Sequence, residues 1–219
     1  MITFESIKND PSIRTYIKQA DASLHALGYT EHSFAHVTKV AETAAYILSS
    51  LGYPERQIEL ARIAAFLHDI GNLVNRVDHS QSGAIMAFRI LHNMDMPADE
   101  LSAIVTAIGN HDEGTGVPVN PISAALIIAD KSDVRRTRVR NSDFSTFDIH
   151  DRVNYSVERS DLSLSAEERE LTLRLTVDTS ISAVMDYFEI FIGRMKMCRN
   201  AASALGLRFR LFINGQALL

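Results

Sequence analysis

A histidine and an aspartate stand side by side at the end of an apolar stretch of the sequence. The run Ala64–Leu67 leads into His68 and Asp69, and Gly71 follows two residues later. Buried polar groups cost free energy unless they are hydrogen-bonded or bind a metal ion. Because neighbours on a helix point about 100° apart, the pair could hold one ion from a helix end, divide between two ions, or bond to nearby backbone. Gly71 can adopt a positive φ, which predicts that it ends this helix.

Further candidate ligands recur at the ends or on the buried faces of the other predicted helices. They are His36, His79, His111 and Asp130. No single helix can surround an ion, so ligands for a buried site in a helical bundle come from several helices. Six ligands are too many for one tetrahedral zinc ion, but they suit two ions if a carboxylate bridges them. Asp69 is the natural bridging residue.

The first 140 residues have the hydrophobic periodicity of helices. Asp10-Pro11 and Asn120-Pro121 are typical of a helix N-terminus. The predicted helices span about residues 10–28, 31–50, 54–69, 79–93, 97–110 and 120–130. We therefore expect a mainly α fold whose first part, residues 1–140, is a bundle of about six helices.

From about residue 141 the pattern changes to period two. Val153, Tyr155 and Val157 alternate with polar residues, as do the apolar residues within 171–177 and 207–213, which predicts three strands. A long apolar helix is predicted over about residues 181–205, and Asn214-Gly215 is typical of a hairpin turn. Residues 141–219 are thus expected to form a small α+β subdomain (strand, strand, helix, strand). Its helix must be covered by the sheet or by a second copy of the chain, so a homo-oligomer through this subdomain is one option.

Composition narrows the class of partner. The chain has 219 residues and a formal net charge of -5 with both signs interspersed, which argues against binding to a nucleic-acid polymer. No apolar run approaches the ~20 residues that cross a bilayer, so no membrane partner is expected. The single Cys198 cannot form an internal disulfide, and no N-terminal signal segment is evident, which favours the cytoplasm. A small molecule is the expected partner.

The order and local context of the candidate ligands resemble the signature of HD-domain metal-dependent phosphohydrolases. The matching residues are His36, the doublet His68-Asp69 within HDIG, and Asp130. The resemblance covers residues from about 30 to 140 and implies a helical domain that binds one or two divalent ions of Mn, Fe, Co, Zn or Ni. His79 and His111 lie where a dinuclear branch of the family has two further ligands.

This resemblance implies an enzyme that hydrolyses phosphate ester or anhydride bonds in a small nucleotide-like substrate, through metal-activated water. In that scheme Asp69 bridges two ions and acts with His68 at the catalytic centre, while His36 and Asp130 complete one ion. His79 and His111 would hold the other ion. Two alternatives remain: a di-iron oxygenase with the same ligands, because histidine and carboxylate suit several metals, or a non-catalytic module that binds a nucleotide or a partner.

Two departures from the family pattern limit the substrate. Asn72 stands where many dinuclear members have a lysine, so a cation that could hold phosphate is absent there, although Asn72 is still close enough to the doublet to contact substrate. The segment after His111 lacks the paired histidines and the GYP motif of cyclic-dinucleotide phosphodiesterases. We therefore do not expect that activity.

Other polar residues are candidates for roles around the metal ligands. His32, predicted one turn before His36 on the same helix face, could contact substrate or a ligand. Glu113 and Asp133 could form hydrogen bonds to the metal ligands without binding the metal themselves. The remaining histidines, His150 among them, lie in polar stretches and are expected at the surface.

A run of basic residues follows Asp130. Lys131 and Arg135, predicted one turn apart on the same helix, are expected to reach a substrate phosphate, because guanidinium matches phosphate with two hydrogen bonds. Positive side chains also interact favourably with a helix C-terminus. That simpler explanation is the one we expect for Arg138 and Arg140.

Overall fold

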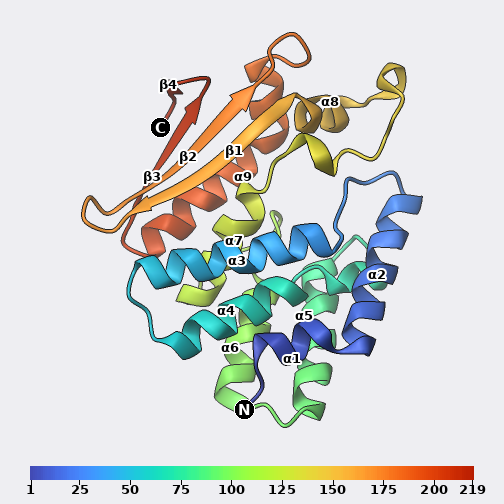
Figure 1. The fold of residues 1–219 in the computed structure, drawn as a ribbon, viewed down its shortest axis with the longest axis vertical. Coiled ribbons are helices and arrows are strands. Elements are labelled where there is room, and N and C mark those ends of the chain that lie inside the picture. Colours follow the sequence, from blue (N-terminus) through green and yellow to red (C-terminus); the bar gives the residue numbers. More distant parts are fainter.

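The computed structural model describes residues 1–219 and combines nine α-helices with one four-stranded sheet (Figure 1). The first seven helices are α1 (Phe4–Asn9), α2 (Pro11–Ala26), α3 (Phe34–Ser50), α4 (Glu55–Leu67), α5 (His79–Asn93), α6 (Ala98–Gly109) and α7 (Pro121–Ser132). A 3₁₀ turn, Ile70–Leu73, joins α4 to α5. The later elements are α8 (Ile149–Ser156), β1 (Val157–Ser165), β2 (Glu170–Val177), α9 (Val184–Ala204), β3 (Arg208–Ile213) and β4 (Gln216–Ala217). The chain is therefore mainly α with a C-terminal sheet, as expected, and is not all-helical.

The helix boundaries follow local capping. Asp10 and Asn120 accept hydrogen bonds from the first turns of α2 and α7, as their positions before proline predicted. Helix α3 begins at Phe34, not near residue 31, because the Ser33 side chain caps it by accepting from Ala35 N. The prediction that His32 lies on this helix is therefore wrong.

Two short helices were not predicted. Helix α1 has only six residues, too few for a periodic pattern, and the helix count before residue 136 is seven rather than about six. The strand expected around residues 153–157 is helix α8, and β1 begins only at Val157. Val153 and Val157 are both buried. A spacing of four fits one face of a helix as well as alternation in a strand, so the pattern was ambiguous.

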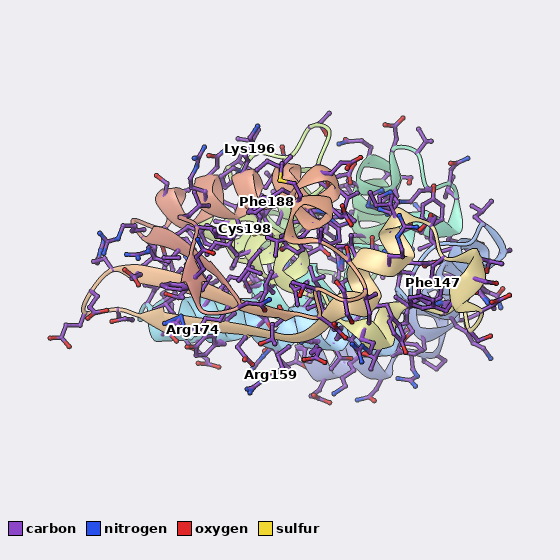
Figure 2. The ribbon with its side chains drawn as sticks, turned by 90° about the horizontal axis from the view of Figure 1, so that it is seen from above. Phe147, Arg159, Arg174, Phe188, Lys196 and Cys198 are labelled. Atoms are coloured by element: carbon purple, nitrogen blue, oxygen red, sulfur yellow. The ribbon has the colours of Figure 1, made fainter.

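The sheet has the order β1-β2-β3-β4. Strands β1 and β2 are antiparallel, β2 and β3 are parallel with α9 as their crossover, and β3 and β4 form a hairpin. Asn214 and Gly215 have φ of 51° and 80°, which is the backbone of the predicted tight turn. Leu171, Leu173 and Leu175 of β2 are buried, whereas Arg159 on β1 projects from the side of the sheet opposite α9 (Figure 2).

Helix α7 joins the two parts of the chain. It packs against α3 on one side and against α9 on the other, and residues 122–129 of α7 are all buried. The buried apolar residues of the helices and of the sheet form one continuous cluster. Cys198 lies within it on α9, where burial raises the pKa of its thiol to about 12. The C-terminal segment, residues 141–219, is thus docked on the helix that carries Asp130. None of the helices is both long and apolar enough to span a lipid bilayer.

Gly71 has a different role from the predicted one. Helix α4 ends at Leu67, and Gly71 lies in the following 3₁₀ turn without a positive φ. An added Cβ would lie 2.0 Å from His79 O and 2.4 Å from Gly83 N. The glycine is therefore required because the backbone after His68-Asp69 approaches the start of α5 closely.

We expect Gly71→Ala to destabilise the protein by about 1–3 kcal/mol or more, the usual cost of inserting a carbon into a filled site. The clash is with backbone atoms, which cannot rotate away. Thermal unfolding monitored by circular dichroism measures the effect. Gly114→Ala is the matched control, because nothing lies within 4 Å of its added Cβ and its φ is not positive. Equal melting temperatures for the two variants would contradict the close approach.

Candidate metal centre

Four histidines from different elements turn the same ring nitrogen toward one point. Their other ring nitrogens are held from behind: His36 Nδ1 donates to Asp133 Oδ2 (2.8 Å), and Nδ1 of His68, His79 and His111 donates to the carbonyl oxygens of Ala65 (2.7 Å), Arg76 (3.1 Å) and Ile108 (2.6 Å). Carbonyl and carboxylate oxygens only accept hydrogen bonds, so each Nδ1 carries a proton. With Nδ1 occupied in this way, Nε2 is the nitrogen of each ring that can bind a metal ion once it carries no proton.

Asp69 lies between two pairs of these histidines. Its Oδ2 atom is 3.2 Å from His68 Nε2 and 3.6 Å from His36 Nε2. Its Oδ1 atom is 3.4 Å from His79 Nε2 and 4.0 Å from His111 Nε2. The two oxygens of one carboxylate thus face different histidine pairs, which is the geometry that a bridging ligand needs.

Asp130 completes the cluster from α7. Its Oδ1 atom is 3.4 Å from His36 Nε2 and 3.7 Å from His68 Nε2. All six predicted ligands therefore meet at one place, and their ligand atoms include two overlapping groups, one of His36, His68 and Asp130 and one of His68, Asp69 and His111.

These donors fit divalent metal ions. Two ligand atoms that are each about 2.0–2.2 Å from one ion lie roughly 3–3.5 Å apart, close to the separations seen. His36 Nε2 and His68 Nε2 are buried without a hydrogen-bond partner, which is costly unless a cation occupies the space they face. His79 Nε2 and His111 Nε2 are 3.2 Å apart with both lone pairs directed inward. A cation between them would remove that repulsion.

The two carboxylates dominate the electrostatics of the cluster. Burial disfavours the His68 imidazolium, but Asp69 and Asp130 outweigh it and raise the pKa of His68 to about 10. Burial and the positive charge of His68 lower the pKa of His111 to about 3. Burial alone would raise the pKa values of Asp69 and Asp130. The charge of His68 nevertheless holds the pKa of Asp69 well below its usual range, and the charge of Lys131 does the same for Asp130. Both carboxyl groups are therefore ionised and can bind a cation.

Asp133 supports His36 from behind. It is 2% exposed, and besides His36 it contacts Lys39 (Nζ to Oδ1, 3.2 Å) and Arg135 (Nε to Oδ1, 3.0 Å). Although burial opposes ionisation, the hydrogen bond from His36 and the charge of Arg138 hold the pKa of Asp133 far below its usual range. A charged Asp133 fixes the ring orientation and the tautomer of His36.

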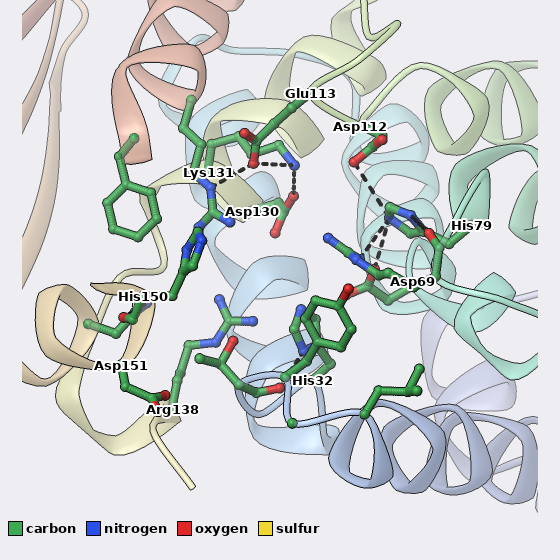
Figure 3. Close-up of a pocket in the computed structure, with 18 of the residues that line it drawn as sticks. His32, Asp69, His79, Asp112, Glu113, Asp130, Lys131, Arg138, His150 and Asp151 are labelled. Carbon is green, nitrogen blue, oxygen red and sulfur yellow. Dashed lines mark hydrogen bonds and ion pairs between the residues drawn. The ribbon is translucent and has the colours of Figure 1, made fainter. Parts of the chain in front are cut away.

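A cavity of about 630 Å³ opens beside the cluster (Figure 3). The candidates from the sequence that line it are Asp69, His79, Asp130, His32, Lys131 and Glu113. His32 precedes α3, donates from Nδ1 to Thr30 O (2.7 Å), and packs edge-on against His36. Burial holds the pKa of His32 well below its usual value, so the ring is neutral. Lys131 Nζ lies 2.8 Å from Asp130 Oδ2 at the edge of the cluster.

The structure does not bring Asn72 and Arg135 into this cavity. Asn72 is buried and its amide donates to Asp69 O and Asp69 Oδ1 (both 2.9 Å), so it orients the bridging candidate. The prediction that Lys131 and Arg135 share a helix is wrong, because α7 ends at Ser132. Arg135 instead donates to Asp133 and Thr137 and lies 3.4 Å from Glu31.

Several charged cavity residues had no sequence signal that placed them there. Arg76 from the loop before α5, Arg138, His150 and Arg194 all line the cavity. The expectation of a helix-end charge for Arg138 is wrong, because α7 ends at Ser132. His150 is exposed, as expected, and also borders the cavity. Only Arg138 had a local hint, since it follows Asp130 within the same basic run. The other positions depend on how α8 and α9 dock.

We expect His79→Ala or His111→Ala to reduce the occupancy of one of two bound ions and to leave the other. Each ring faces only the Oδ1 side of Asp69, so its loss spares the donors around Oδ2. Elemental analysis of the purified variants measures the metal per chain. His25→Ala, at an exposed position on α2, is the control. Two full ions in both variants would show that these histidines are not ligands.

Comparison with known proteins agrees with this site. Residues 33–137 match the family model of the HD domain. An uncharacterised protein of Methanocaldococcus jannaschii is 27% identical over 192 residues, which cover 77% of this chain and 73% of the relative. The crystal structure of a predicted HD superfamily hydrolase from an uncultured Thermotogales bacterium is 25% identical, with a TM-score of 0.44, and the match covers 62% of this chain and 75% of that one. The matched segment contains all six residues of the cluster, and residues 33–137 are therefore identified as an HD domain.

Proposed function

We propose that this protein is a metal-dependent hydrolase that cleaves phosphate ester or anhydride bonds in a small nucleotide-like substrate. The observation that supports this proposal is the convergence of four inward-facing Nε2 atoms and two carboxylates beside a polar cavity. Divalent ions bound there would lower the pKa of a water molecule and neutralise charge on a phosphoryl group.

The surrounding residues suit the binding of a phosphoryl group. Lys131 and Arg76 place positive charge at the edge of the cluster, because Lys131 Nζ is 2.8 Å from Asp130 Oδ2 and Arg76 Nη1 is 3.3 Å from His79 Nε2. Asn72 holds Asp69, and Asp133 holds His36, so the ligands remain oriented without substrate. The neutral His32 ring donates from Nδ1 to Thr30 O, so its Nε2 can accept a hydrogen bond from a hydroxyl or amino group of the substrate.

The size and lining of the cavity favour a small substrate. A volume of about 630 Å³ is in the range of small-molecule sites, roughly 300–1,000 Å³. Tyr29 also lines the cavity and is exposed, so it offers an aromatic surface to a ring system such as a nucleobase. A polymer backbone would need a longer basic surface than this cavity provides.

A substrate panel tests the proposal. Mono-, di- and cyclic nucleotides, dinucleoside polyphosphates and simple phosphate esters are incubated with the protein in Mn, Co, Fe or Mg, and released phosphate and nucleoside are measured. Turnover of at least one phosphorylated compound, lost on chelation, is the expected result. If none is cleaved while iron-loaded protein consumes oxygen, the hydrolase proposal is wrong and the oxygenase alternative replaces it.

A further inference from the structure

The cavity contains two arginines that do not adjoin the metal cluster. Arg138 comes from the segment after α7, and Arg194 comes from α9 in the C-terminal segment. Both lie outside residues 33–137, the part of the chain that matches the HD-domain model. The cavity therefore has a second source of positive charge, partly from a segment that the family signature does not describe.

Arg138 is a buried cation whose charge is only partly balanced. It is 4% exposed, and its Nε and Nη1 atoms donate to the carbonyl oxygens of Glu31 and Asp133 (both 2.9 Å). Neutral carbonyls fix the guanidinium but do not neutralise it. Asp133 Oδ2 lies 3.8 Å away and already accepts from His36. In Figure 3 the guanidinium points into the cavity, so its remaining hydrogen-bonding face is available there.

Arg194 is fixed by two neighbours. Its Nε donates to Glu113 Oε1 (2.7 Å), and its guanidinium stacks on the Phe191 ring at 4.4 Å. Glu113 also approaches Lys131 at 4.0 Å, so its charge is shared between two cations. Burial lowers the pKa of Arg138, and the positive charge of Arg194 lowers it further. The two guanidinium groups therefore repel each other across the cavity when no anion lies between them.

Acidic residues on the same wall are occupied by local structure. Asp148 caps α8 by accepting from Asp151 N (2.8 Å), and Asp151 lies 3.3 Å from the Asn141 amide. Neither forms an ion pair with Arg138 or Arg194 within 4 Å. An oxyanion from outside the chain is thus the group best suited to balance the two arginines.

We propose that Arg138 and Arg194 together bind an oxyanion of the substrate other than the phosphoryl group that is hydrolysed. This inference rests on the proposed hydrolase function and narrows its substrate class to phosphorylated molecules that carry a second phosphate or a carboxylate. Guanidinium groups bind both kinds of oxyanion with paired hydrogen bonds. The C-terminal segment then contributes to specificity by supplying one of the two arginines.

Anion binding by the full chain without metal tests the site separately from catalysis. The protein is treated with a chelator, and binding of inorganic phosphate and of acetate is measured by isothermal titration calorimetry. Phosphate should bind, and Arg138→Gln or Arg194→Gln should each weaken it about ten- to a hundredfold, the effect of losing one charge-assisted contact. Stronger binding of phosphate than of acetate assigns the second group as phosphate; the reverse order assigns it as carboxylate.

Two further variants keep the test decisive. Arg136→Gln is the matched control, because Arg136 belongs to the same basic run but donates to Tyr155 O and does not line the cavity. Arg194 is 26% exposed, so its variant should fold even if the Arg138 variant does not. With a cleaved substrate in hand, both cavity variants should raise KM more than they lower kcat.

The outcomes separate the two proposals. Phosphate or acetate binding that depends on Arg194, with no cleavage of any phosphorylated compound, supports the anion site and rejects the hydrolase. Hydrolysis with KM and anion binding unchanged in Arg194→Gln supports the hydrolase and rejects the anion site.

Discussion

Replacing Asp69 by alanine is expected to remove most of the bound metal and to lower kcat/KM by roughly a thousandfold or more. The two oxygens of Asp69 face different histidine pairs, at 3.2 and 3.6 Å on one side and 3.4 and 4.0 Å on the other. Loss of this one residue therefore weakens both ion positions. Metal-ion catalysis contributes several kcal/mol, and each 1.4 kcal/mol corresponds to about tenfold in rate. Metal per chain and hydrolysis of the best panel substrate are the two measurements.

The control for this experiment is Asp161→Ala. Asp161 is an exposed aspartate on β1 that pairs with Arg159 and does not line the cavity. The Asp161→Ala variant loses the same kind of side chain as Asp69→Ala and should keep both the bound metal and the activity. If Asp69→Ala still holds two ions per chain, Asp69 is not the bridging ligand, and the resemblance to the dinuclear branch of the family does not extend to this residue.

The residues that meet at the cluster could be selected from the sequence because each lies beside a helical apolar pattern. The buried stripe of α3 carries His36, the apolar end of α4 delivers His68-Asp69, and α7 is buried on all sides up to Asp130. A polar side chain next to such a stripe must find a partner in the core. Their residue types and order then matched a known signature. Their meeting point, however, depends on helix packing that no local pattern contains.

The cavity wall was much harder to predict. Val153 and Val157 satisfy the periodicity of a strand as well as that of helix α8, so the sequence does not place the exposed His150 on a helix that borders the cavity. The sequence predicts Arg135 beside Lys131 only if the helix continues through residue 135, but α7 ends at Ser132. The actual end at Ser132 turns Arg135 toward Asp133 and lets Arg138 reach the cavity. The positions of the other residues in the cavity wall depend on how α9 packs against the rest of the chain, which no local sequence pattern contains.

One buried carboxylate connects the metal cluster with the proposed anion site. Asp133 accepts from His36 Nδ1 on one side, while its backbone carbonyl accepts from Arg138 Nη1 on the other. It also pairs with Arg135, and Glu31 pairs with Arg135 in turn. Asp133 is the only hydrogen-bond partner of His36 Nδ1 and the only carboxylate within 4 Å of the Arg138 guanidinium. Asp133 therefore sets the position of groups in both sites.

Asp133→Ala is expected to lower the free energy of unfolding by about 3–5 kcal/mol and to weaken metal binding about ten- to a hundredfold. Removing one member of a buried charge network leaves Arg138 without its nearest carboxylate, which is strongly destabilising. Loss of the partner of a metal-binding histidine typically costs that range of affinity. Urea unfolding in the presence of a chelator measures the free energy of unfolding without the contribution of bound metal. Titration with metal measures the metal affinity.

Asp133→Asn separates the two effects of Asp133. The amide oxygen of asparagine can still accept from His36 Nδ1, so the ring orientation and much of the metal affinity should be kept. The charge is lost, so Arg138 has no carboxylate within 4 Å and the destabilisation should persist. Equal metal affinity in the wild type and in Asp133→Ala would show that His36 is oriented by its packing in α3 and not by this hydrogen bond. Equal stability of all three proteins would show that Arg138 needs no internal carboxylate.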